Sequence, residues 1–299
     1  MQVSSIGVVG AGQMGAGIAQ VSACAGFSVT LVDIKADVIE SGIASIRSSL
    51  ARIVSKGRLD QKTSDEALDR IQTSLDLGDL AECDLVVEAI PEVLDLKTST
   101  FNRLDAICKP STILASNTSS ISINTIAEYT SRPERVIGMH FMNPVPIMKL
   151  VEVINGTHTT EIVTSEVISV IEALGKTPLQ CNDSPGFVSN RILCPMINEA
   201  IITLDEGVAE VEAIDGIMKL GMNHPIGPLA LADLIGLDTV LNIMRVLHEG
   251  LGEEKYAPSP LLVSMVSEGK LGRKTKIGFY KYSVSYTHLR AHEASTYLV

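Results

Sequence analysis

The sequence predicts an α/β fold: an N-terminal Rossmann-like domain with a doubly wound, mostly parallel sheet, followed by a C-terminal all-α domain. Three observations lead to this prediction. Short apolar runs alternate with longer helical patterns through the first half of the 299-residue chain, which is typical of a parallel sheet covered by helices. A glycine-rich motif separates the first apolar run from the first helical pattern. Beyond residue 186 only helical patterns follow.

Composition and charge restrict the class of protein. At about 150 residues per domain, 299 residues make about two domains, and 45% hydrophobic with 20% charged residues is typical of a globular chain. The formal net charge of −11 disfavours nonspecific nucleic-acid binding, which depends on basic surface. No apolar run reaches the roughly 18 residues of a membrane span, and the first residues lack a signal-peptide pattern. We therefore expect a cytoplasmic protein with no nucleic-acid or membrane partner.

The cysteines give no sign of a metal site or a disulfide framework. They are scattered at positions 24, 83, 108, 181 and 194, and they form no Cys-x-x-Cys pair and no cluster with histidine. This pattern fits free thiols in a reducing compartment. We expect no metal.

Strands of the first domain are expected at short runs of β-branched and apolar residues. Several runs are apolar without alternation, as in strands buried on both faces of a parallel sheet. Longer amphipathic stretches between them predict the covering helices. The expected strands are Ser5–Val9, Ser28–Val32, Leu85–Ala89, Thr112–Ala115, Val136–His140, Lys149–Ile154 and Thr177–Cys181, and the expected helices are Gln13–Ala25, Ala36–Ser55, Leu96–Cys108 and Glu161–Leu174.

A domain boundary is expected at the turn-forming segment Asn182–Gly186. It divides a dinucleotide-binding domain, residues 1–183, from a helical domain for substrate binding and dimerisation, residues 184–282. Two of the later helices carry more apolar surface than one small domain can bury, so we expect a homodimer. The expected helices are Phe187–Asp205, Val208–Leu220, Leu229–Leu234, Thr239–Leu251 and Leu261–Glu268. Residues 283–299 lack an amphipathic period and are expected to be an unstructured or non-native tail.

A glycine motif follows the first expected strand. Gly10, Gly12 and Gly15 form Gly-x-Gly-x-x-Gly between that strand and a helix, and in this context the pattern indicates dinucleotide binding. The first glycine allows a tight turn, the second lets backbone approach a pyrophosphate, and the third lets the helix pack on the strand. The helix start offers N–H groups to phosphates. We expect the cofactor to contact Gly10, Ala11, Gly12, Gln13, Met14 and Gly15.

Asp33 ends the second expected strand, 18 positions after Gly15. This is near the roughly 20-residue spacing of the acidic residue that binds the adenine ribose hydroxyls. A carboxylate at this place repels a 2′-phosphate, so the sequence favours NAD over NADP. Lys35 lies nearby and keeps NADP as an alternative.

His140 and Glu152 are candidates for proton transfer. His140 ends an expected strand before a rigid segment with two prolines, and ligands of open α/β sheets bind at that end. Glu152 lies in the next apolar strand, where a buried carboxylate needs a partner. A carboxylate bonded to one imidazole nitrogen stabilises the protonated ring, while the other nitrogen can take a proton from an alcohol. A purely structural histidine remains the alternative from these residues alone.

One face of the second expected helix carries Ser45, Ser49, Arg52 and Lys56 at helical spacing. Further basic residues lie nearby in the sequence, and we call the whole set the basic stripe. Between residues 47 and 62 the only acidic residue is Asp60. This face suits an anionic ligand such as the phosphates of CoA, and a solvated surface is the alternative. The stripe comprises Ser45, Arg47, Ser49, Arg52, Lys56, Arg58 and Lys62.

Taken together, the sequence resembles the 3-hydroxyacyl-CoA dehydrogenase family, and within it the bacterial 3-hydroxybutyryl-CoA dehydrogenases, over residues 3–282. The resemblance implies NAD-dependent interconversion of short-chain (S)-3-hydroxyacyl-CoA and 3-oxoacyl-CoA, in fatty-acid breakdown or butyrate metabolism, by a homodimer. Six segments in order carry it: GAGQMG from Gly10, VVEAIPE (Val86–Glu92), ASNTSS (Ala115–Ser120), GMHFMNPVPIMKLVEV (Gly138–Val153), DSPGFVSNRI (Asp183–Ile192) and HPIGPLALADLIGLD (His224–Asp238).

The resemblance also implies roles for residues at matching positions. His140 and Glu152 would form the general acid/base dyad. Ser119 and Asn190 would hydrogen-bond and polarise the 3-oxygen of the substrate. The cofactor would contact Asp33, Glu92, Lys97, Ser119, Asn143 and, from the second domain, Lys274, and CoA would contact Ser49, Lys56 and Ser119.

One position departs from the family pattern. The family pattern near the end of the second domain is Lys-Ser/Thr-Gly-x-Gly-Phe-Tyr, and here Lys274-Thr275 is followed by Lys276. A lysine in place of the first glycine leaves open the local turn, and with it the contact expected from Lys274.

Two other functions remain open. One is a dehydrogenase of the same superfamily that acts on a free hydroxy acid, such as a sugar acid; the basic stripe favours CoA over this reading. The other is a non-catalytic relative of the kind found among lens crystallins. The presence of a complete set of candidate catalytic residues argues against it: His140, Glu152, Ser119 and Asn190.

Overall fold

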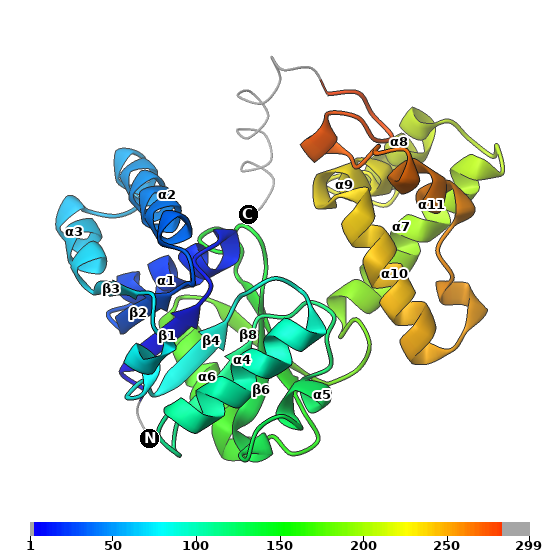
Figure 1. Cartoon of the computed structure of the whole chain (residues 1–299). Helices are drawn as coiled ribbons and strands as arrows, with labels where there is room; N and C mark the ends of the chain where they lie inside the picture. The colour runs from blue at the N-terminus through cyan, green and yellow to red at the C-terminus, as the bar shows by residue number, and fades with distance from the viewer. Residues whose placement is uncertain (1–2, 283–299) are drawn as a thin grey trace. The chain divides into compact units, whose positions relative to one another are not determined.

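The computed structural model describes residues 3–282 and divides the chain into two compact units (Figure 1). The first unit ends at Phe187 and the second begins at Val188, whereas the boundary expected from the sequence follows Asp183. The first unit is α/β and the second is helical, so the predicted fold class is confirmed. The tail expected at 283–299 lies outside the described residues.

The first unit contains an eight-stranded sheet in the order β3-β2-β1-β4-β5-β6-β7-β8. Neighbouring strands are parallel except for β6 and β7, which are antiparallel. The strand order reverses between β1 and β4, which is where open α/β sheets bind ligands. The strands are β1 (Ser5–Val9), β2 (Ser28–Val32), β3 (Ile71–Ser74), β4 (Leu85–Glu88), β5 (Ile113–Ser116), β6 (Val136–Phe141), β7 (Leu150–Asn155) and β8 (Thr177–Asn182).

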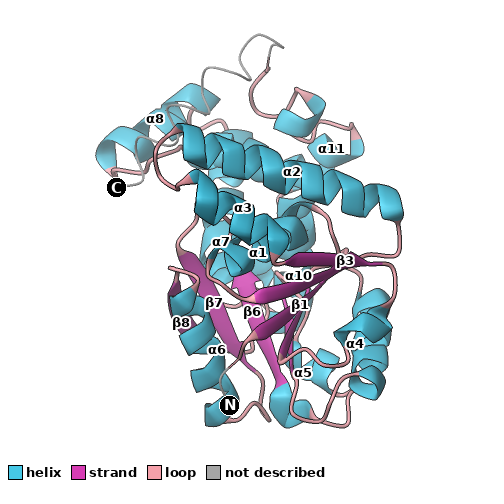
Figure 2. Cartoon of the chain, turned by 90° about the vertical axis from the view of Figure 1, so that its left-hand side faces the viewer, coloured by secondary structure: helices cyan, strands magenta, loops and turns pink. Residues whose placement is uncertain are grey.

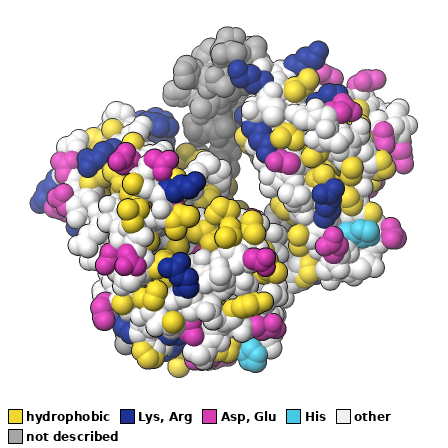
Figure 3. All heavy atoms as spheres, in the orientation of Figure 1, with side chains coloured by type: hydrophobic (Ala, Val, Ile, Leu, Met, Phe, Trp, Pro, Cys, Tyr) yellow, Lys and Arg dark blue, Asp and Glu magenta, His cyan; other side chains and the backbone are white. Residues whose placement is uncertain are grey.

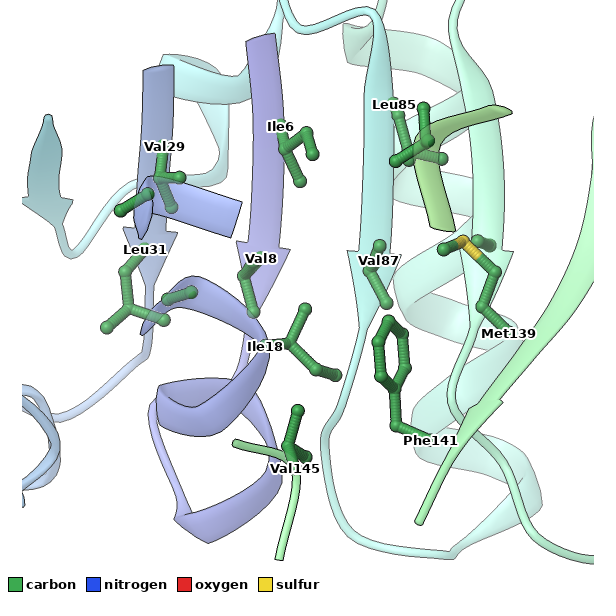
Figure 4. Packing of buried hydrophobic residues seen from close by; sticks show 14 of the residues in the cluster. Ile6, Val8, Ile18, Val29, Leu31, Leu85, Val87, Met139, Phe141 and Val145 are labelled. Carbon is green, nitrogen blue, oxygen red and sulfur yellow. The ribbon is translucent and has the colours of Figure 1, made fainter. Parts of the chain in front are cut away.

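Helices cover both faces of this sheet, because successive strand residues point to opposite sides. On one face Val8 and Val87 pack in a cluster with Ile18 of α1 (Figure 4), together with residues of α2 and α6. On the other face Val86 packs with residues of α4 and α5. Figure 2 shows these helices from a second side: α1 (Gln13–Cys24), α2 (Ala36–Ser55), α3 (Gln61–Asp69), α4 (Leu94–Ile107), α5 (Ile123–Ala127) and α6 (Glu161–Ala173).

Three elements of the first unit were not expected from the sequence: β3, α3 and α5. Strand β3 reads Ile-Gln-Thr-Ser and lies at the edge of the sheet, where only one neighbour pairs with it. Helix α3 is short and polar, and Asp60 caps it by accepting the N–H of Thr63 at 2.7 Å. Helix α5 is a single short turn of five residues. Each lacks the long apolar period on which the prediction depended.

The second unit is a bundle of helices around a core of its own. Its buried residues include Ile197, Leu237 and Leu262. The helices agree with the predicted ones to within a few residues at each end. They are α7 (Ser189–Asp205), α8 (Val211–Gly221), α9 (Pro228–Ile235), α10 (Leu237–Leu251) and α11 (Pro260–Ser267).

Two buried carboxylates tie the end of the described chain to this bundle. Asp233 accepts the N–H groups of Phe279 and Tyr280 at 3.0 and 2.9 Å. Asp215 accepts the Tyr280 hydroxyl at 2.8 Å. Within residues 3–282, none of the helices has the length and apolar character needed to cross a membrane.

Candidate active site

The glycine turn lies at the carboxyl end of β1, beside the reversal of strand order. Gly10 has a φ of +100°, which favours glycine, and its N–H donates to the Val32 carbonyl at 2.7 Å. A Cβ on Gly15 would lie 1.8 Å from the Gly10 oxygen, so a side chain cannot be accommodated without moving backbone. A Cβ on Gly12 would meet no protein atom within 4 Å. The space beside Gly12 is therefore open to a ligand.

The start of α1 and the end of β2 flank this space. Within the described chain, the first N–H groups of α1 receive no side-chain cap, so they remain able to bind an anion. Asp33 accepts the N–H of Ala11 at 2.8 Å through one oxygen and that of Lys35 at 3.1 Å through the other. These backbone bonds hold the carboxylate in place. The arrangement fits a dinucleotide, with the pyrophosphate at the glycine turn and a ribose at Asp33.

The loop after β6 reaches the same region. The side chain of Gln13 donates to Asn143 Oδ1 at 3.0 Å, so two residues expected to contact the cofactor lie together. Lys176 is buried, and its ammonium donates to the carbonyls of Val145 and Met148 at 2.5 and 2.7 Å. Burial lowers the pKa of Lys176. This lysine therefore fixes the part of the loop that follows Asn143.

His140 and Glu152 face each other across the antiparallel pair of β6 and β7. His140 Nδ1 and Glu152 Oε2 are 2.7 Å apart, and both side chains are buried. The ring of Phe187 lies beside the imidazole, with centroids 5.9 Å apart. Because Nδ1 is directed to Glu152, Nε2 is the nitrogen that can meet a substrate.

Glu92 holds the turn that carries Ser119. Its Oε1 accepts the Thr118 hydroxyl at 2.6 Å and the N–H groups of Ser119 and Ser120 at 2.9 Å each. Burial alone would raise the pKa of Glu92, but the nearby Lys97 ammonium and these hydrogen bonds lower it on balance. The carboxylate is therefore a fixed negative charge beside Ser119.

Lys97 lies inside the protein rather than on the surface of the cofactor site. Its side chain is 1% exposed, and its ammonium lies 2.6 Å from Glu88 Oε1 and 3.3 Å from Glu92 Oε2. Glu88 was not among the expected site residues. A signal was available, because a charge that ends a wholly apolar strand needs a buried partner, the same reasoning that pointed to Glu152.

The basic stripe follows α2 as expected. This helix spans Ala36–Ser55, and Lys56 is its C-terminal cap. Ser45, Arg52 and Lys56 are exposed, and Ser49 is half-buried. Figure 3 shows Lys and Arg side chains over α2 and α3, with Asp and Glu side chains between them. The basic stripe is thus open to solvent, on a surface that also carries acidic side chains.

Two expected site residues belong to the second unit. Asn190 lies in the first turn of α7. Lys274 lies in a short 3₁₀ helix (Arg273–Thr275), and its ammonium bonds to both carboxylate oxygens of Asp238. Lys276 has a φ of +62°, a left-handed conformation that favours glycine. This conformation gives the physical reason for the glycine in the family pattern.

The described residues include no group of three His, Cys, Asp or Glu side chains placed to hold a metal ion. The cysteines are all free thiols. Burial raises the pKa of Cys194 to about 12, so this thiol is inert.

Two family models match the chain nearly end to end. The NAD binding domain of the 3-hydroxyacyl-CoA dehydrogenases matches residues 5–184, and their C-terminal domain matches residues 186–282. Among curated relatives, a Deinococcus radiodurans protein named "probable 3-hydroxybutyryl-CoA dehydrogenase" is 59% identical over 276 residues, which are 92% of this chain and 99% of that one. The 3-hydroxybutyryl-CoA dehydrogenase of Bradyrhizobium diazoefficiens is 55% identical over 280 residues, 94% of this chain and 96% of that one.

A solved structure gives the same result. The crystal structure of (S)-3-hydroxybutyryl-CoA dehydrogenase from Ralstonia eutropha matches with a TM-score of 0.92 and 50% identity, covering 94% of this chain and 100% of that chain. Sequence, fold and both domain matches agree. The chain belongs to the 3-hydroxyacyl-CoA dehydrogenase family.

Proposed function

We propose that this protein catalyses the NAD-dependent oxidation of (S)-3-hydroxyacyl-CoA to 3-oxoacyl-CoA, and the reverse reaction, with the short-chain substrate 3-hydroxybutyryl-CoA. Membership of the family and the names of relatives that match over nearly their whole length support the substrate. The observation that carries the chemistry is the 2.7 Å contact of His140 with Glu152 at the end of the sheet.

His140 is the general base of the oxidation. Glu152 accepts a hydrogen bond from Nδ1, which fixes the tautomer and favours the imidazolium. Nε2 then removes the proton of the 3-hydroxyl group and returns it in the reverse direction. When bound, the nicotinamide accepts the hydride in oxidation and donates it in reduction.

Ser119 and Asn190 hydrogen-bond to the 3-oxygen of the substrate. The hydroxyl group of Ser119 donates to Glu92 Oε1 at 3.2 Å in this structure and would turn its proton to the substrate oxygen. Together with the side-chain amide of Asn190, it would favour negative charge on that oxygen during hydride transfer. Glu92 supports this role, because it holds the backbone of Ser119 and Ser120.

The cofactor is NAD rather than NADP. Asp33 is fixed by two backbone N–H groups, so it cannot swing away from a 2′-phosphate, which its charge repels. NADH should therefore outperform NADPH, and Asp33→Ala should narrow the difference. A wild-type preference for NADPH would show that Lys35 or another cation decides the choice.

The decisive experiment compares acyl carriers. We expect NADH oxidation with acetoacetyl-CoA, a much weaker reaction with free acetoacetate, and a preference for C4 over C8 and C16 acyl chains. Turnover of free hydroxy acids without turnover of acyl-CoA would support the alternative dehydrogenase of a free acid. The absence of turnover with both, in protein that binds NADH, would support a non-catalytic relative.

The protein acts as a homodimer through its second unit. Helix α8 supports this assembly, because it exposes apolar side chains on a surface that a monomer would leave in water: Leu220 is 90% exposed and Ile217 is 60% exposed. Met222 follows directly after this helix and is exposed too.

A further inference from the structure

Glu88 is a buried carboxylate that the proposed mechanism does not use. It ends β4 and is 0% exposed. One oxygen accepts the N–H of Ile90 at 2.7 Å and the ammonium of Lys97 at 2.6 Å, and the other accepts the hydroxyl of Ser116 at 2.7 Å. These partners come from the turn after β4, from α4 and from the end of β5. Glu88 therefore joins three separate segments at the carboxyl edge of the sheet.

The first route from Glu88 to the active site runs through Lys97. The ammonium of Lys97 contacts Glu92 Oε2 at 3.3 Å as well as Glu88. With Oε2 held in this way, Glu92 presents Oε1 to the N–H of Ser119 at 2.9 Å. The position of Ser119 therefore depends on a chain of charged contacts that begins at Glu88.

The second route runs through Ser116. Its hydroxyl group donates to Glu88 and accepts the N–H of Thr118 at 3.2 Å. Thr118 is the first residue of the turn that Glu92 holds. Glu88 thus supports the same turn from the β5 side and from the α4 side.

Stability alone does not account for this buried pair. Replacing a buried ion pair by packed apolar side chains is often neutral or stabilising, because desolvation offsets the attraction between the charges. Such a replacement could not orient the carboxylate of Glu92. The function of the pair must therefore be sought in orientation.

We propose that Glu88 is a positioning residue, which through Lys97 and Ser116 fixes Glu92 and the turn of Ser119 against the reacting end of the substrate. This proposal rests on the function proposed above, since it concerns the same site. Glu88 itself is fully buried, so it is not placed to touch cofactor or substrate.

A double-mutant cycle tests this role. Glu88→Gln keeps the shape and removes the charge that Lys97 needs, so Lys97 should draw Glu92 away from the turn. We expect kcat with acetoacetyl-CoA to fall by about ten- to a hundredfold, the scale of a misplaced reactive group. If Glu88 acts through Glu92, the Glu88→Gln/Glu92→Gln enzyme should be no slower than the slower single variant. If the losses of kcat multiply in the double variant, the proposal is overturned.

The same strand offers a matched control. Asp84 directly precedes β4, at the end away from the site, and its carboxylate bonds to Lys109 at 2.8 Å. Asp84→Asn makes the same change, carboxylate to amide, in a pair that is more exposed than Glu88 and Lys97. It should lower the melting temperature and leave kcat and KM unchanged. If Glu88→Gln did likewise, the role of Glu88 would be structural and the proposal wrong.

A milder variant covers the case in which Glu88→Gln fails to fold. Ser116→Ala removes one hydrogen bond to Glu88 without changing any charge. Its loss of kcat should be smaller, about threefold to tenfold as for one hydrogen bond of about 1 kcal/mol, and it should disappear in the Glu92→Gln background. A loss that persists in that background would contradict the proposal.

NADH binding separates this test from that of the function. The dissociation constant of NADH, measured by cofactor fluorescence without substrate, should rise in Glu88→Gln and in Glu92→Gln but no further in the double variant. A wild-type protein that binds NADH and leaves acetoacetyl-CoA unreduced contradicts the proposed function. If the losses of NADH affinity multiply in the double variant, the positioning role of Glu88 is contradicted, and the proposed function is not affected.

Discussion

At the residue scale, the proposed chemistry depends on one register pair of the sheet. His140 and Glu152 are directly opposed in β6 and β7, so the strands themselves bring the imidazole to its carboxylate. The pair is buried, which strengthens the hydrogen bond and would make either partner costly to leave alone. Loss of either side chain should therefore affect the same step.

We expect His140→Gln to lower kcat by about 10²–10⁴-fold, because glutamine keeps polarity but cannot hold the proton. Glu152→Gln should also lower kcat, since the amide no longer stabilises the imidazolium. The double variant should be little slower than the slower single variant, because the two residues act as a unit. Steady-state kinetics with acetoacetyl-CoA measures kcat for the three variants, and the NADH affinity of each serves as the control. Near-normal turnover in His140→Gln would exclude the dyad.

Lys276 gives a prediction about stability. Its left-handed conformation, with a φ of +62°, destabilises the folded state by about 1–2 kcal/mol for a non-glycine residue. Glycine avoids this strain, but its more flexible unfolded chain offsets part of the gain. Lys276→Gly should therefore raise the free energy of unfolding by up to about 1 kcal/mol, measured by urea denaturation. Lys276→Ala, which keeps the Cβ, should show no gain. Destabilisation by glycine would mean that the lysine side chain contributes a contact.

At the element scale, Asp84 ties the start of β1 to the end of α4. It accepts the N–H groups of Ser4 and Ser5 at 2.9 and 3.1 Å, and Lys109 bonds to its second oxygen. Burial alone would raise the pKa of Asp84, but the Lys109 ammonium and the serine donors lower it far below its ordinary value.

This lowered pKa predicts how stability depends on pH. A carboxyl group with a lowered folded-state pKa stabilises the fold above its unfolded pKa of about 4, and that contribution is lost as pH falls toward the folded pKa. The difference in unfolding free energy between wild type and Asp84→Asn should have its full size at about pH 7 and should shrink steadily below about pH 4. Urea titrations across this range measure it. A difference independent of pH would show that charge is not the cause.

Helix α2 gives a prediction for substrate binding. Lys56 belongs to the basic stripe, caps the end of α2 and is exposed, so its removal should leave the fold intact. Lys56→Ala should raise KM for acetoacetyl-CoA and barely change KM for acetoacetyl-pantetheine, which lacks the nucleotide phosphates. Initial rates with the two substrates measure this. An equal effect on both would mean that Lys56 does not meet the nucleotide.

The elements with strong periodicity could be predicted from the sequence, and those without it could not. The apolar runs of β1 and β4 and the long amphipathic face of α2 are local signals. Edge strand β3 buries little, and α5 is too short to show a period. At the site, the glycine turn and Asp33 have fixed spacing, whereas Glu88 meets Ser116 only because β4 and β5 are neighbours in the folded sheet. Such partners cannot be read from spacing along the chain.

At the scale of the whole molecule, the proposed homodimer would assemble through the second unit. The exposed apolar residues of α8 are costly in water, and a second copy of the chain would bury them. We expect a dimer by light scattering, and Leu220→Lys should shift it toward monomer while helix content by circular dichroism stays the same. A wild-type monomer at all concentrations would contradict this assembly, and an unchanged dimer in the variant would place the interface elsewhere.

The antiparallel pairing of β6 and β7 also bears on how such proteins diversify. The pair His140–Glu152 is set by the register of two neighbouring strands, and the connection between them, residues 142–149, does not enter that register. A slip of one residue in either strand would turn a side chain to the opposite face. An insertion or deletion in the connection would leave this register unchanged. The loop that carries Asn143 could therefore vary in length while the proposed proton-transfer pair stays opposed.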